Sequence, residues 1–210
     1  MNISKKYKKY RRVGIELNKK IAEKMLEEFD LDGAVNLLGF DRQGQTIIFD
    51  SEFEMDVMSD FFRFESIKDG KRPIDVYKEE YPPTSEIEKE ILESLVDSHS
   101  SLFKIERIDR EKNIIWLSDI LNEKQNILLV DIGLSTSAEV GLLMFTRLIS
   151  FDDFCMTSGV SFVFNPNLAS YLKRRYKKIM KKLKIESDST KKFTAFFRLS
   201  KECGMEVINQ

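Results

Sequence analysis

The stretch from residue 101 to residue 164 decides the fold. It contains five apolar runs: SLFKIERI (101–108), NIIWLSDIL (113–121), QNILLVDIGL (125–134), VGLLMFTRLI (140–149) and FCMTSGVSFVF (154–164). Charged or glycine-containing breaks separate them, and short runs at this spacing are typical of antiparallel strands that close towards a barrel. Several runs are apolar at consecutive positions, so both faces of the sheet are expected to be covered. We predict an α+β fold: a small curved antiparallel β-sheet or partly open barrel over about 101–164, packed by N- and C-terminal helices.

Five strands follow from these runs, with a bulge or bend expected at Gly159. Their predicted bounds are 102–108, 113–121, 126–132, 140–149 and 154–164, with a loop at 133–138. A short strand at 46–48 and another at 206–208 are also expected.

The sequence on either side of this core has helical periodicity. Apolar residues recur at three- and four-residue steps from Tyr10 to Phe29, which predicts an amphipathic helix over 3–29. Further helices are expected at 34–38, from Ser51, at 73–80, at 85–97, from Asn165 and at 190–203. We predict one α+β domain over 1–210, with a basic helix (1–30), a helical region (31–100), the β core (101–164) and basic C-terminal helices (165–210).

Local signals mark several helix starts. Ser51 with Glu54, and Ser85 with Glu88, have the spacing of capping boxes, and Pro73 suits the first position of a helix. The sequence FDLDG (29–33) superficially matches a phosphatase motif with an Asp nucleophile. A charged helical segment precedes it instead of the buried strand that such a motif needs, so we expect Asp32 to be a helix N-cap.

Composition excludes several classes of protein. Hydrophobic residues make up 42% of the chain and charged residues 33%, which suits a folded domain. No signal peptide and no membrane-spanning run are recognised, and Cys155 and Cys203 have no metal-binding spacing, so we expect a cytoplasmic protein with free thiols. His99 is the single histidine and is expected on the surface, which argues against most Ser–His and Cys–His mechanisms. No cofactor motif is present, and none is predicted.

Charge is distributed unevenly although the net charge is −1. Residues 1–24 hold nine Lys or Arg against two Glu, and residues 171–192 hold ten against two acidic residues. The second segment predicts phosphate contacts along one helix, with Tyr171 and Tyr176 as stacking groups. The candidate phosphate-binding residues are Lys173, Arg174, Arg175, Lys177, Lys178 and Lys181. The alternative is a packing helix whose back is simply solvated.

Two other groups of residues are candidates. Arg147 interrupts an apolar run, and a buried Arg needs a carboxylate, so we expect a pair with Asp119 or Asp131. Arg147 and Asp119, with the loop 133–138, would form a site at the rim of the sheet, where the basic C-terminal helix could meet them. Acidic residues crowd a second region, where oxygen ligands suit Mg²⁺ or Mn²⁺. These are Asp50, Glu52, Glu54, Asp56 and Asp60.

One family resemblance rests on an ordered set of segments. They are Phe61-Phe62-Arg63-Phe64, RPIDVY (72–77), SHSSLFKIERID (98–109), LSDIL (117–121), Leu134-Ser135, GLLMFTRLI (141–149) and SGVSFVF (158–164). Over about 55–165 the chain resembles an uncharacterised bacterial family, some members of which carry a SEC-C zinc segment. The aromatic stretch departs from the family, which more often has Trp and Asp there, and this chain lacks a Cys cluster for the zinc segment. The resemblance implies one evolutionary unit and no activity.

The sequence favours a non-catalytic binding or regulatory module whose partner is unknown, with nucleic acid as the sharpest candidate. A carboxylate-based Mg²⁺- or Mn²⁺-dependent enzyme is an alternative. A self-assembling scaffold, in which basic ends of one copy meet acidic helices of another to form a homo-oligomer, is a third.

Overall fold

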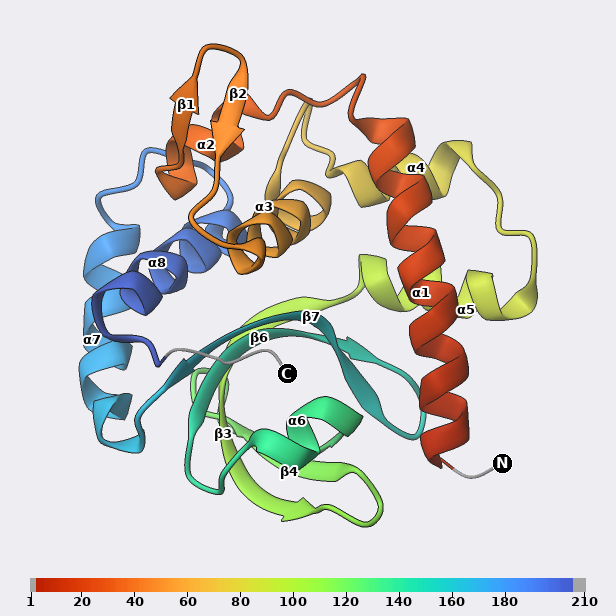
Figure 1. Cartoon of the computed structure of the whole chain (residues 1–210), viewed down its shortest axis with the longest axis vertical. Helices are drawn as coiled ribbons and strands as arrows, with labels where there is room; N and C mark the ends of the chain where they lie inside the picture. The colour runs from red at the N-terminus through yellow and green to blue at the C-terminus, as the bar shows by residue number, and fades with distance from the viewer. Residues whose placement is uncertain (1–2, 206–210) are drawn as a thin grey trace. The chain divides into compact units, whose positions relative to one another are not determined.

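The structure, a computed structural model, describes residues 3–205 (Figure 1). It contains two compact units, which we name the barrel unit (residues 1–9 and 97–210) and the helical unit (10–96). The division of 1–210 into one α+β domain stays a prediction, and the strand expected at 206–208 lies outside the described residues. Within 3–205, no helix is both long enough and apolar enough to cross a membrane.

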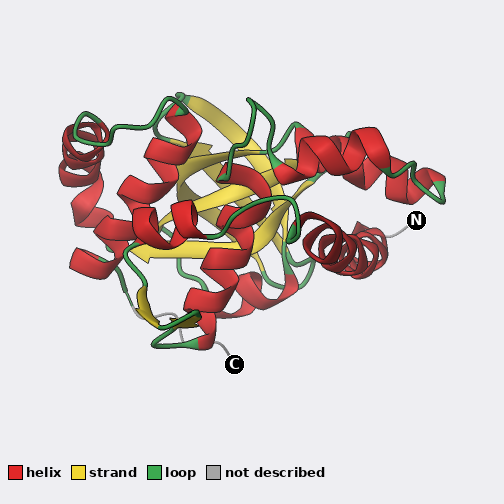
Figure 2. Ribbon diagram, turned by 90° about the horizontal axis from the view of Figure 1, so that it is seen from above, coloured by secondary structure: helices red, strands yellow, loops and turns green. Residues whose placement is uncertain are grey.

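The barrel unit is built on five strands that close on themselves in the order β3-β4-β5-β7-β6. Figure 2 shows them curling round a common interior. The strands are β3 (His99–Asp109), β4 (Ile114–Asp119), β5 (Lys124–Val130), β6 (Leu143–Ser150) and β7 (Cys155–Phe164). Four of the five neighbouring pairs are antiparallel. The fifth, β5–β7, is parallel and has a single pair, Leu129 opposite Cys155. The predicted fold class is therefore confirmed, with a closed but uneven barrel.

Apolar side chains fill the inside of the barrel. The register places Phe103 opposite Met144 and Ile115 opposite Leu129, so their side chains share one face of the sheet. The buried cluster contains Phe103, Ile105, Ile115, Leu117, Leu129, Ala138, Met144 and Leu148. A packed interior of this kind is expected where a small barrel has too little room for a channel.

A layer of phenylalanines covers the outer face of β6 and β7. Phe145 stacks on Phe196 of α8 (Asp188–Cys203), with ring centroids 4.2 Å apart. Phe162 contacts Phe193 and Phe197 of the same helix at 5.6 and 5.8 Å. The prediction that helices cover the sheet is thus confirmed for the C-terminal region, and aromatic rings supply the contact.

The remaining helices of the barrel unit are short or amphipathic. They are α6 (Ile132–Ser137), the 3₁₀ helix η1 (Pro166–Leu168) and α7 (Ala169–Met180). The predicted loop at 133–138 was wrong, because Asp131 accepts a hydrogen bond from the Leu134 N–H and caps a helix there. The bulge predicted at Gly159 is confirmed, since β7 gains residues between the partners of Thr146 and Leu148.

The helical unit contains five helices and one hairpin among its described elements. These are most of α1 (Ile3–Met25), then α2 (Asp32–Leu38), β1 (Asp41–Gln43), β2 (Thr46–Ile48), α3 (Glu52–Glu65), α4 (Pro73–Glu80) and α5 (Glu86–Val96). The strand β1 was not predicted. Asp32 is not an N-cap, because Leu31 holds that position and the Asp30 carboxylate accepts from the Asp32 N–H.

Both predicted capping Ser residues are confirmed, with one change. Ser51 and Ser85 accept from the N–H groups of Glu54 and Glu88. The two Glu side chains, however, reach one residue further back than in a standard box, to the N–H groups of Asp50 and Thr84. Each helix start is therefore closed from both sides.

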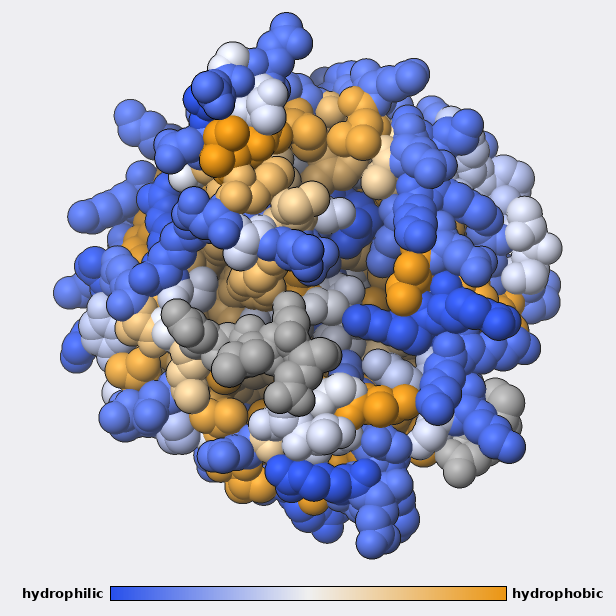
Figure 3. Space-filling model, in the orientation of Figure 1, coloured by the Kyte–Doolittle hydropathy of each residue, from blue (hydrophilic) through white to orange (hydrophobic). Residues whose placement is uncertain are grey.

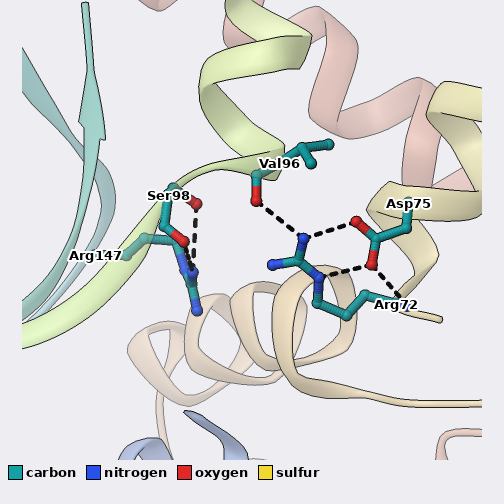
Figure 4. A network of polar contacts seen from close by, with 5 residues as sticks. All are labelled: Arg72, Asp75, Val96, Ser98 and Arg147. Carbon is teal, nitrogen blue, oxygen red and sulfur yellow. Dashed lines mark hydrogen bonds and ion pairs between the residues drawn. The ribbon is translucent and has the colours of Figure 1, made fainter. Parts of the chain in front are cut away.

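Arg72 joins two helices of the helical unit. Its guanidinium donates to Asp75 in the first turn of α4 and, at 2.9 Å, to the Val96 carbonyl at the end of α5 (Figure 4). The carbonyl at a helix C-terminus carries partial negative charge and lacks a helical partner, so the cation stabilises it. Pro73 follows at the predicted first helical position.

Candidate functional site

A row of cations lies on one side of α7. Lys173, Arg174, Lys177, Lys178 and the C-cap residue Lys181 are all exposed. At 100° per residue they fall within an arc of about 140°, and we name them the α7 basic face. In Figure 3 the side of the molecule on which α7 lies, at the left, is covered mainly by hydrophilic residues.

The opposite side of α7 holds the helix in place. Leu172 and Ile179 are buried, and the ring of Tyr176 stacks on Phe196 at 5.2 Å. Burial also raises the pKa of the Tyr176 hydroxyl. Tyr176, which was predicted to be a stacking group, therefore stacks on Phe196 and anchors the helix.

The five basic side chains make no ion pair or hydrogen bond with any residue in 3–205. Arg175, the sixth candidate, differs: it is half-buried and pairs with Glu202 of α8 at 3.5 Å. Tyr171 donates to the same carboxylate. The structure therefore separates Arg175 and Tyr171, which link α7 to α8, from the α7 basic face.

The second candidate pair does not form. The Asp119 carboxylate is buried and accepts from the Ser101 hydroxyl at 2.6 Å, from the Asn122 amide at 2.7 Å and from two backbone N–H groups that follow it. Asp131 accepts from Leu134 and Thr157. Arg147 donates to the carbonyl and hydroxyl of Ser98 (Figure 4).

The register explains why Arg147 and Asp119 stay apart. Arg147 lies opposite Ser100 on β3, whereas Asp119 bonds to Ser101. Consecutive residues of a strand point to opposite faces, so Arg147 is on the outer face of the barrel and Asp119 on the inner face. The predicted rim site is not one place either. Asp119 lies opposite Lys124 in the β4–β5 ladder, at the start of β5, whereas α6 follows the end of β5.

A cavity of about 310 Å³ opens where β5 and β7 part. We name it the barrel pocket. Its polar lining includes His99, Lys124, Ser150 and Cys155, and its apolar walls include Ile127 and Leu148. The ladder puts His99 opposite Leu148, and Ser150 opposite Cys155, so these side chains share the inward face of the barrel. None of them had been predicted to form a site, because the sequence carries no signal for the single β5–β7 pair.

Two carboxylates of the candidate metal site have partners within the helical unit. Glu54 accepts from the Asp50 N–H, and Asp60 lies 3.8 Å from the Arg63 guanidinium. In 3–205, no three His, Cys, Asp or Glu side chains are grouped so that they could hold a metal ion. The two cysteines are free thiols among the described residues.

Comparison with curated proteins and with solved structures finds no match. A protein-family model, described as a family of unknown function (DUF7986), matches residues 1–210, which is the whole chain. The chain therefore belongs to this family of unknown function, DUF7986.

Proposed function

We propose that this protein is a non-catalytic binding module that contacts the phosphate backbone of nucleic acid through the α7 basic face. One observation carries the proposal: five exposed cations share an arc of one helix and have no acidic partner within 3–205. We also propose that the protein is located in the cytoplasm and that it is related to bacterial proteins with SEC-C zinc segments.

The clustering of these positive charges destabilises the isolated helix α7. Lys173, Lys177 and Lys181 follow one another at four-residue steps, and like charges at that spacing destabilise a helix by about 0.2–0.5 kcal/mol per pair. The helix dipole favours cations only near the C-terminus, which accounts for Lys177 and Lys178 but not for Lys173 and Arg174. A polyanion would relieve this repulsion.

The spacing suits a phosphate backbone. Lys173 and Lys181 are eight residues apart, or about 12 Å along the helix, and one strand of duplex DNA carries a phosphate about every 3.4 Å. Since Tyr176 is packed on Phe196, no aromatic stacking is supplied from this face. We therefore expect binding that depends on salt and not on base sequence.

The test is a fluorescence-anisotropy titration of labelled duplex DNA and single-stranded RNA at several salt concentrations. The variant K173Q/K177Q removes two charges while it keeps good helix formers. We expect the slope of log affinity against log salt to fall by about 2 for DNA. The matched control is K78Q/K89Q, which removes two exposed lysines from α4 and α5 and should leave the slope unchanged.

Two outcomes oppose the proposal. Absence of affinity for both nucleic acids at low salt ends it, and equal slopes for the two variants would place the contact elsewhere. A mass above that of one chain at low salt, reversed by K173Q/K177Q, would instead support the self-assembling scaffold.

A further inference from the structure

The barrel pocket is a cavity with apolar walls and charged side chains in its lining. Ile127, Leu148 and the ring pair Phe151–Phe154, whose centroids are 5.0 Å apart, form apolar parts of its lining. Ser150 and Cys155, whose Oγ and Sγ atoms lie 3.4 Å apart, also line it. A largely apolar cavity with a few convergent polar groups is the usual form of a small-molecule site, and barrel mouths are a frequent place for one.

Charged side chains of both signs line the cavity: Lys124 lies on β5, and Asp152 and Asp153 lie between β6 and β7. Partial burial lowers the pKa of the His99 ring; the Asp119 carboxylate acts against this, and Lys124, Lys192 and Arg147 add to the lowering. The Asp119 charge is already satisfied by four hydrogen bonds. Of the two aspartates, Asp153 pairs with Lys6 at 2.7 Å. Lys124 itself has no ion pair with any residue that the structure describes.

The backbone adds further binding groups. The strand β5 pairs with β7 only at Leu129, so the edge of residues 124–128 that faces away from β4 has no ladder partner within 3–205. Backbone N–H and C=O groups without a ladder partner are strong hydrogen-bonding groups. They lie beside Lys124 and at the side of the cavity.

We propose that the barrel pocket binds a small monocarboxylic acid with an apolar body. Its carboxylate pairs with Lys124 beside the ring of His99, and its body lies between Ile127, Leu148 and the two phenylalanines. A charged hydrogen bond to Lys124 supplies orientation, and burial of the body supplies most of the affinity. This site is separate from the α7 basic face and does not depend on nucleic-acid binding.

Cys155 makes a reporter for the cavity. In a C203S background it is the one remaining thiol of the sequence, and its alkylation by N-ethylmaleimide is followed by mass spectrometry. The probes are hexanoate, 3-phenylpropanoate and indole-3-acetate at millimolar concentration, each compared with its uncharged amide. Inorganic phosphate serves as the bare anion.

We expect at least one of these acids to slow the alkylation of Cys155 and its amide to do so at least tenfold more weakly. K124Q should weaken protection about tenfold, which corresponds to the loss of about 1.4 kcal/mol of binding free energy. K78Q, an exposed lysine of the helical unit, should have no effect. S150F, at an exposed position that lines the cavity, should abolish protection by the acid while the melting temperature shows that the fold is kept.

Three results overturn the proposal: protection by none of the acids, equal protection by acids and amides, or an unchanged response in K124Q. Equal protection by phosphate overturns the apolar part of it. DNA binding by K124Q is the separate readout, and we expect it to match the wild type.

Discussion

Ser101 and Asp119 share a buried hydrogen bond of 2.6 Å between β3 and the end of β4. The Asp119 carboxylate has three further donors, the side-chain amide of Asn122 and the backbone N–H groups of Leu121 and Asn122. Burial alone raises the pKa of Asp119, but these hydrogen bonds outweigh that effect and hold it below its ordinary value. The carboxylate thus ties the β4–β5 hairpin to the neighbouring strand.

Replacement of Ser101 by Ala should destabilise the barrel unit. A hydrogen bond to a charged group contributes about 1.5–3 kcal/mol, and we expect the free energy of unfolding to fall by that amount. The measurement is urea denaturation at neutral pH. S158A is the control, because the buried Ser158 hydroxyl has no hydrogen-bond partner among the described residues; a loss as large as that of S101A would contradict the assignment.

The lowered pKa of Asp119 predicts a dependence of stability on pH. A carboxyl whose pKa is lower in the folded state stabilises the protein above its unfolded pKa, about 3.9, and this contribution is lost as pH falls through the folded value. Wild-type protein should therefore lose stability below about pH 4. In D119N that part of the loss should be missing, so the two unfolding free energies should converge between pH 7 and pH 3; parallel curves would contradict this.

The phenylalanine layer should be sensitive to truncation. Phe196 contacts Phe145, Phe164 and Tyr176 and is fully buried. F196A removes a large side chain from this layer, and we expect a loss of about 3–5 kcal/mol in unfolding free energy. V140A, at a position that is 60% exposed, should change stability by less than about 0.5 kcal/mol. A small effect of F196A would mean that α8 does not depend on this layer.

Both thiols should react slowly at neutral pH. Burial raises the pKa of Cys155, and burial together with the charge of Glu202 raises that of Cys203. Because the thiolate is the nucleophile, alkylation by iodoacetamide at pH 7.5 should be slower than for free cysteine, and the rate should still be rising above pH 9. Each thiol is measured alone, in C203S and C155S; a rate that levels off near pH 8 would contradict the prediction.

Signals that act over a few residues were read correctly from the sequence. Ser51, Ser85 and Pro73 begin helices because their side chains, or the ring of Pro, act on the adjacent turn. Gly159 marks the bulge of β7 because it can adopt a φ of 117°. The apolar runs likewise located every strand of the barrel, although the bounds moved by up to three residues.

The register of the strands could not be predicted from the sequence in the same way. Whether Arg147 and Asp119 share a face depends on a pairing between β3 and β6, whose partners lie more than forty residues apart, and shifting a strand by one residue exchanges its faces. The barrel pocket depends on the single β5–β7 pair and so escaped prediction too. The α7 basic face was predicted because it lies within one helix, yet Arg175 and Tyr176 needed the position of α8 to be assigned correctly.

The short β5–β7 seam also bears on how copies of this protein avoid one another. An open strand edge invites pairing with a strand of another molecule and hence aggregation. Here the first residues of β5, Lys124, Gln125 and Asn126, are exposed and polar, and Glu123, which precedes them, is charged and has a φ of 58°. Such an edge resists the approach of a second chain, while the apolar part of the seam, at Ile127 and Leu128, is only half-exposed. The opening between β5 and β7 is therefore suited to binding a small solute and not to pairing with a strand of another molecule.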